Sequence, residues 1–205
     1  MTSPAGLRER KKAATRAALS HAAWSLMITA GLSSVTPEAI AAAADVSPRT
    51  FRNYFASREE AILGELLQRH LALLDKLRGR PADEALWDGL EQILPQGVTE
   101  IVGDRDSFAV LAEEIRRNPA MLAQNLVVFQ DAAIQMAAIF AERTATDLDA
   151  DPGPRLLAAA VCAAISTSID LWISGAIDRT LPELIRDCLA RLRAGLPMGA
   201  AEPAA

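Results

Sequence analysis

Three helix-start signals follow one another between residues 36 and 60, and they restrict the fold more than any other feature of the sequence. Thr36-Pro37 and Ser47-Pro48 each join an N-cap residue to a proline at the first helical position, and Ser57-x-x-Glu60 is a capping box. A helix that begins at each signal leaves space for only two short helices, over residues 37–44 and 48–55. The spacing predicts a helix-turn-helix whose second helix is about two turns long.

The composition indicates helices along the rest of the chain as well. Hydrophobic residues make up 51% of the sequence and aromatic residues only 4%, without strict apolar–polar alternation. We therefore predict an all-α fold of about nine helices, with a three-helix head over 7–56, a larger helical body over 57–196 and a disordered tail over 197–205. The first helix is expected over 7–30. Body helices are expected over 57–77, 82–94, 98–101, 106–117, 119–144, 156–175 and 180–195, with a break at Pro95 and Gly97.

Charge is divided unevenly between the two ends of the chain. Residues 1–60 carry eight basic and five acidic side chains, whereas the remaining residues carry 13 basic and 21 acidic ones, for a net charge of −5 overall. A basic head on an acidic body suits a protein that meets phosphate at one end only. The basic run over 8–12 is either an arm that holds phosphate or a solvated run of charge.

Several other classes of protein are disfavoured. Because the sequence contains no uninterrupted apolar stretch of 18 or more residues and no signal-peptide pattern, we predict no membrane span and a cytoplasmic location. Two cysteines, Cys162 and Cys188, and two histidines do not form a metal-ligand spacing. Neither a metal nor another cofactor is therefore predicted.

The two-turn helix over 48–55 has two chemically different faces. Phe51 and Phe55 are four residues apart and share one face, while Arg49 and Asn53 lie roughly opposite and Thr50 and Arg52 lie on the flanks. The phenyl rings can anchor the helix, and the polar side chains can bind phosphates and base edges. The alternative is an ordinary solvated surface helix, which would not need to be short and capped after a three-residue turn.

Residues 36–63, TPEAIAAAADVSPRTFRNYFASREEAIL, resemble the DNA-binding segment of the TetR (tetracycline-repressor) family of bacterial regulators. The shared pattern is T-x-x-x-I-A-x-x-A-x-V-S followed by Y-F-x-S-[KR]-E. The family commonly has glycine at the position of Arg49 and an aromatic residue at that of Arg52, so no known operator can be transferred. With the basic run, the resemblance implies DNA contacts by Arg10, Lys11, Lys12, Thr36, Ser47, Arg49, Thr50, Arg52, Asn53, Tyr54 and Arg58, the last pointing at the DNA backbone.

The resemblance also implies a small-molecule pocket in the helical body. Large apolar side chains with a few polar ones among them would line it, and an apolar or amphipathic effector is expected. His70 stands where its helix should bury a leucine, so it is either a satisfied core histidine or a ligand contact. The candidate ligand-binding residues are His70, Trp87, Phe108, Met121, Asn125, Phe129 and Trp172.

The helix over 156–175 is apolar on more than one face, so it needs more than one packing partner. One partner can be the body of the same chain and the other a two-fold mate, although a fully internal helix is the alternative. A homodimer also suits the head, because one short helix reads too few bases to be selective. The candidate interface residues are Val161, Ile165, Trp172, Leu184, Cys188 and Leu192.

Together these features predict a transcriptional regulator, and members of this family are most often repressors. We expect it to bind a palindromic operator in double-stranded DNA as a homodimer and to be released by an effector. A helical enzyme is the first rival, but neither histidine lies near a nucleophile and no pair of carboxylates shares a buried face. A dimeric adaptor that uses its helix-turn-helix to contact protein is the second. The arginines and the asparagine opposite the phenylalanine pair disfavour it.

Overall fold

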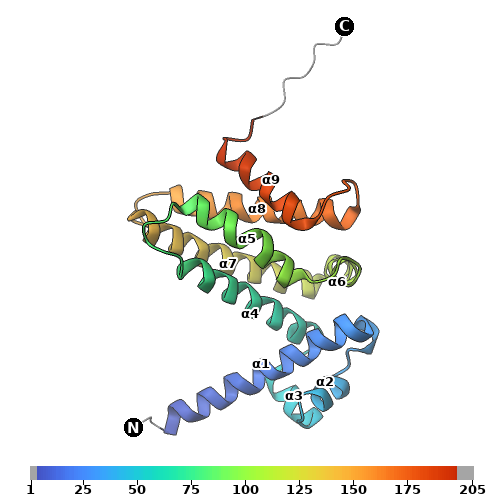
Figure 1. Ribbon diagram of the computed structural model, residues 1–205. Coiled ribbons are helices and arrows are strands. Elements are labelled where there is room, and N and C mark those ends of the chain that lie inside the picture. The colour runs from blue at the N-terminus through green and yellow to red at the C-terminus, as the bar shows by residue number, and fades with distance from the viewer. Residues whose placement is uncertain (1–3, 198–205) are drawn as a thin grey trace. The chain divides into compact units, whose positions relative to one another are not determined.

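The computed structural model describes residues 4–197, and the side chains of residues 8–197. Within this range the chain is all-α, as predicted, and no strand occurs (Figure 1). The predicted tail, except Pro197, lies outside the described residues. The elements are α1 (Pro4–Ala30), the 3₁₀ turn η1 (Leu32–Ser34), α2 (Pro37–Ala43), α3 (Pro48–Tyr54), α4 (Arg58–Arg78), α5 (Leu86–Val102), α6 (Arg105–Arg117), α7 (Pro119–Thr144), α8 (Gly153–Ser174) and α9 (Leu181–Arg193).

The chain forms two compact units. The first contains residues up to 71 together with 103–131, and the second contains 72–102 together with the residues from 132 onward. Helices α4 and α7 each contribute to both units because each continues without interruption through a division point. The predicted boundary at residue 56 therefore does not coincide with this division, and the separation of head from body stays a functional prediction.

In the first unit, α1, α2 and α3 surround a small apolar core. Leu19 and Met27 of α1, Ile40 of α2 and Phe51 of α3 are each at most 2% exposed. The caps that the sequence predicted hold the short helices: the Thr36 hydroxyl accepts from the Ala39 amide at 3.1 Å, ahead of α2. Short helices of this kind are marginal alone, so the core and the caps together keep them folded.

In the second unit, α9 packs against α5 and α8. Its apolar stripe of Leu181, Leu184, Ile185 and Leu189 is at most 2% exposed. The predicted capping box is present at the start of α9, where the Glu183 carboxylate accepts from the Thr180 amide at 2.9 Å. An apolar stripe of this width is the pattern of a helix that lies on a core.

The predicted break at Pro95 and Gly97 is wrong, because α5 runs through both residues. Pro95 and Gly97 are buried, and a Cβ on Gly97 would stand 2.2 Å from the Leu73 side chain. Close packing against α4 therefore favours glycine here although glycine weakens helices. The Thr99 hydroxyl also donates to the Pro95 carbonyl at 2.8 Å, which supports the helix just after the proline.

The sequence analysis excluded a long apolar helix, and helix α8 corrects that prediction. Its hydropathy averages 1.9 over an 18-residue window, so by length and composition it could cross a membrane, and it is the one such helix among the described residues. The sequence of α8 contains no uninterrupted apolar stretch of 18 residues, because serine and threonine follow the apolar residues 156–165. Only 17% of the window is buried within the chain, and Leu156, Ala159 and Ala163 are exposed on its outer face.

Gly64 of α4 lies where α1 crosses α4 in the first unit, and it provides a test of this packing. A Cβ on Gly64 would stand 2.7 Å from the Ser20 hydroxyl oxygen and 3.6 Å from the Phe55 ring. We expect Gly64→Ala to lower the free energy of unfolding by about 1 kcal/mol, because overpacking outweighs the gain in helix propensity. Urea unfolding followed by circular dichroism measures this change.

The matched background is Ser20→Ala, which removes the oxygen that the added methyl group would meet. In that background the same Gly64→Ala change is expected to raise the free energy of unfolding by up to about 1 kcal/mol. An equal effect of the change in both backgrounds would contradict the proposed contact.

Candidate nucleic-acid interface

Helix α3, the second helix of the helix-turn-helix, is anchored by its two phenylalanines. Phe51 and Phe55 are 1% and 2% exposed, and their ring centroids lie 5.8 Å apart. The Ser47 hydroxyl accepts from the Thr50 amide at 3.0 Å and so caps the start of the helix. A helix held at its start and along its apolar face has one orientation in the head, which fixes the direction of its other face.

The opposite face of α3 presents polar groups to solvent. Arg49 and Asn53 are exposed, and Arg49 forms no ion pair within the described residues. Arg52 is also exposed, but its guanidinium lies 3.2 Å from the Glu38 carboxylate of α2. Because both side chains of this pair are 63% exposed, the pair is weak in water and can exchange for a phosphate or a base. The arrangement of faces that the sequence predicted is the one found.

Arg16 of α1 links three helices of the head, and the sequence analysis did not assign it a role. Its guanidinium lies 4.1 Å from the centroid of the Phe55 ring, donates to the Tyr54 carbonyl at the end of α3, and lies 2.9 Å from the Glu60 carboxylate of α4. Glu60 also accepts from the Ala56 amide at 2.8 Å. In the sequence, Arg16 stands alone between the basic run over 8–12 and the apolar side chains of the first helix, and no local pattern indicates its partners.

Arg58 is a correction. It was predicted to point at the DNA backbone, but its guanidinium donates to the carbonyls of Leu32 and Val35 at 3.2 and 3.0 Å and pairs with Glu59 at 2.7 Å. The Leu32 carbonyl also accepts from the Val35 amide at 3.2 Å. By its hydrogen bonds to both carbonyls, Arg58 ties the η1 turn to the start of α4. These contacts give Arg58 a structural role in the free chain, and its contact with the DNA backbone stays a prediction.

The other predicted DNA-binding residues lie on the surface of the first unit. Arg10, Lys11 and Lys12 are exposed on α1, and Thr36 and Ser47 are exposed caps. Thr50 and Tyr54 are half-buried on α3. A contact of these residues with DNA stays a prediction, while their accessibility is compatible with it.

The predicted ligand-binding residues fall into both units. In the first unit, the imidazole of His70 meets the Phe129 ring edge to face, with centroids 5.9 Å apart. Asn125, one helical turn before Phe129 on α7, has a buried side-chain oxygen with no hydrogen-bond partner in the described part of the chain. Met121 and Phe108 also belong to this unit, and Met121 is almost fully buried. Trp87 and Trp172 belong to the second unit.

His70 donates from Nδ1 to the Leu66 carbonyl at 2.7 Å, since a carbonyl can only accept. Burial lowers the pKa of His70 below its ordinary value, although the hydrogen bond to Leu66 acts in the opposite direction. The neutral ring then leaves Nε2 as an acceptor. His70 and Asn125 thus supply two side chains with free acceptor capacity among apolar neighbours.

Two of the predicted interface residues are corrections. Val161 and Leu184 are 0% and 2% exposed and belong to the core of their own chain, so neither is available to a partner. Ile165, Trp172, Cys188 and Leu192 are half-buried. Helix α8 instead exposes Leu156, Ala159, Ala163, Ser166, Thr167 and Asp170 on its outer face.

Comparison with known proteins agrees with this architecture. Residues 19–63 match the sequence family described as bacterial regulatory proteins, tetR family, and residues 110–197 match the family described as MftR C-terminal domain. The chain is 32% identical over 203 residues to the HTH-type transcriptional regulator TcmR of Streptomyces glaucescens, with 89% of each chain covered. The chain belongs to the TetR family.

Solved TetR-family structures share its fold. FadR of Thermus thermophilus, a repressor solved with lauroyl-CoA, is 23% identical with a TM-score of 0.63, over 93% of this chain and 99% of that chain. SmeT, the repressor of a multidrug efflux pump of Stenotrophomonas maltophilia, is 18% identical with a TM-score of 0.59, over 92% and 96%. The chain is thus a transcriptional regulator of a DNA-binding family, which is not a family of enzymes.

The lowered pKa of His70 makes stability depend on pH. The unfolded chain binds a proton at His70 near its ordinary pKa, whereas the folded chain binds it only at lower pH. The stability that this residue contributes is therefore complete above its ordinary pKa of about 6.5 and is lost as the pH falls below that value toward the lowered pKa of the folded chain. Urea unfolding at a series of pH values should show this loss in the wild type and a smaller loss in His70→Gln. His21→Gln, at an exposed position, is the control, and an equal change in both variants would rule out the assignment to His70.

Proposed function

We propose that this TetR-family regulator is a cytoplasmic repressor that binds a palindromic operator as a homodimer and is released by an apolar or amphipathic effector. The observation that carries the proposal is the anchored recognition helix. Its phenyl rings are buried and its Arg49 and Asn53 side chains face solvent. Arginine pairs with guanine and asparagine with adenine in the major groove, and a helix of this size fits that groove.

The uncovered face of α8 supports the homodimer. Helix α8 has a mean hydropathy of 1.9 over an 18-residue window, and only 17% of that window is buried within the chain. Its outer face carries Ala159, Ala163 and Ser166, which are small enough for a second helix to approach closely, and Leu156, which is 71% exposed. Asp170 on the same face disfavours lipid as the partner. A second copy would cover this face by two-fold symmetry and place two heads on one duplex.

The unpartnered Asn125 oxygen supports an effector site in the first unit. A buried acceptor without a donor costs about 1–3 kcal/mol, so such groups usually have an external partner. Phe129 lies one helical turn after Asn125 on α7 and meets the His70 ring. We infer that these side chains suit a molecule that has an apolar body and a hydrogen-bond donor. FadR of Thermus thermophilus, which shares the fold, was solved with the amphipathic ligand lauroyl-CoA.

DNA binding is tested with the duplex that the wild-type protein selects from a randomised pool, which we expect to be an inverted repeat. Arg49→Ala and Asn53→Ala should each weaken binding by about 1–3 kcal/mol per half-site, because each removes a base or phosphate contact. Fluorescence anisotropy at several salt concentrations measures both the affinity and its salt dependence.

Arg58→Ala is the matched control for these variants. It removes a guanidinium a few residues away that is bound to backbone carbonyls. We expect it to lower thermal stability while leaving the salt dependence of DNA binding unchanged well below its unfolding temperature. Unchanged affinity in Arg49→Ala and Asn53→Ala, or selection of a single half-site, would contradict the proposed mode of binding.

The dimer is tested by Ala163→Arg on the outer face of α8. Burying an unpaired guanidinium in an apolar interface costs about 3 kcal/mol or more, so the dimer dissociation constant should rise by about 100-fold or more. Sedimentation equilibrium measures this constant, and Ala82→Arg, at an exposed position outside α8, should leave it unchanged. A dimer that tolerates arginine at position 163 would place the interface elsewhere.

A further inference from the structure

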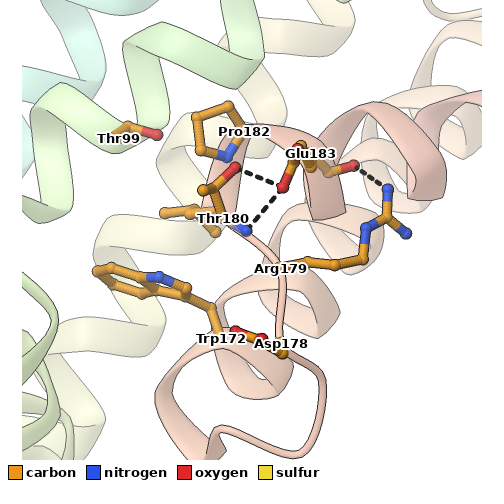
Figure 2. A pocket seen from close by; sticks show the side chains of 8 residues that line it. Thr99, Trp172, Asp178, Arg179, Thr180, Pro182 and Glu183 are labelled. Atoms are coloured by element: carbon orange, nitrogen blue, oxygen red, sulfur yellow. Dashed lines mark hydrogen bonds between the residues drawn. The ribbon is translucent and has the colours of Figure 1, made fainter.

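An open pocket of about 420 Å³ lies in the second unit, at the connection between α8 and α9. Figure 2 shows Trp172 of α8 on one side and Thr99 of α5 and Pro182 of α9 near the other, with the connecting segment over 178–180 between them. Its size is within the range of small-molecule sites. Apart from Trp172, none of its residues was a candidate from the sequence, and it is separate from the Asn125 site of the first unit.

The charged groups that line this pocket leave it negative. The Asp178 carboxylate has no hydrogen-bond or ion-pair partner among the described residues. The Glu183 carboxylate accepts from the Thr180 amide and hydroxyl at 2.9 and 2.8 Å, and these hydrogen bonds lower its pKa and keep it ionised. Arg179 is the one basic lining residue. Its guanidinium donates to the Glu183 carbonyl at 3.2 Å and lies 3.7 Å from Asp187, so its charge is already compensated along α9 (Figure 2).

The start of α9 does not make the pocket a site for anions. Free backbone amides at a helix N-terminus attract anions, but here the capping box pairs the Thr180 and Glu183 amides with protein groups. Pro182 in the first turn has no amide proton. The positive end of the helix is therefore already neutralised by Glu183, and a second anion would meet two carboxylates.

The indole of Trp172 supplies the remaining wall. It is half-buried, and no aromatic ring or guanidinium stacks on it within the part of the chain that the structure describes. The face of an indole attracts cations, and a nearby carboxylate adds to this attraction. A negative pocket with an open indole face has the chemistry that recognises an organic cation.

We propose that the pocket formed by Thr99, Trp172 and the segment 178–183 binds an organic cation, with the cation over the Trp172 ring and its charge balanced by Asp178. A planar aromatic cation or a quaternary ammonium group fits better than a primary amine, because neither has N–H donors on its charged nitrogen that the lining must satisfy. This binding does not depend on the regulator's DNA contacts, so it can be tested on the free full-length protein.

The test compares N-methylquinolinium with neutral quinoline at pH 8 by isothermal titration calorimetry. The two probes have nearly the same shape and differ in charge. We expect the cation to bind at least tenfold more tightly to the wild type and about tenfold more weakly to Asp178→Asn. Trp172→Leu should lose at least tenfold, whereas Trp172→Phe should keep most of the affinity because a phenyl ring also attracts cations.

Asp83→Asn is the matched control, since it removes an equal charge from an exposed position of the same unit, outside both the pocket and α8. It should bind the cation as the wild type does. Equal affinity for the two probes, or equal losses in Asp178→Asn and Asp83→Asn, would overturn the proposal. So would the absence of saturable binding to the full-length protein at millimolar N-methylquinolinium, which would mean that a second copy or another part of the chain fills the pocket.

Discussion

The burial of Phe51 and Phe55 is the interaction on which the DNA-binding head depends. A helix of two turns has almost no stability of its own, so it exists because its rings pack into the core between α1 and α4. The same packing decides the direction of the opposite face, and therefore where Arg49 and Asn53 point. Arg16 strengthens this arrangement, because its guanidinium lies over the Phe55 ring and also binds the last turn of α3. One face of α3 holds the helix in the core, and the opposite face carries the side chains that are proposed to contact DNA.

Arg16 also connects the recognition helix to the rest of the regulator. Through Glu60 it contacts the first turn of α4, where Glu60 and Ser57 cap the helix. Helix α4 continues for 21 residues without interruption, and it carries His70 three turns beyond that cap. A helix is stiff over this length, about 30 Å, so a change at His70 can reach the end of α3 by a rigid movement of α4. The contacts that hold the head together are thus also the contacts through which an effector could move it.

The caps explain why the sequence predicts the head well and the interface poorly. Thr36, Ser47 and Ser57 act on amides three residues away, so the signal for each helix is local and readable. The role of Arg58 is missed because its acceptors, Leu32 and Val35, lie more than 20 positions earlier and no local pattern marks them. Pro95 does not break its helix because a close contact between α4 and α5, at Gly97, outweighs its local preference. For α8 the pattern indicates two apolar faces, but it cannot say that Val161 faces inward and Ala163 outward.

The two candidate small-molecule sites differ in the chemistry they would select. Around Asn125 and His70 the unsatisfied groups are neutral acceptors beside aromatic and apolar side chains, so the bound molecule has to bring a hydrogen-bond donor on an apolar body. Around Trp172 the unsatisfied groups are a carboxylate and an open indole face, so the bound molecule has to bring positive charge. An anion would find no complementary group in the second pocket, and a permanent cation would find no counter-charge among the groups identified at the first. Because these requirements exclude each other, the two proposed sites would select different classes of compound.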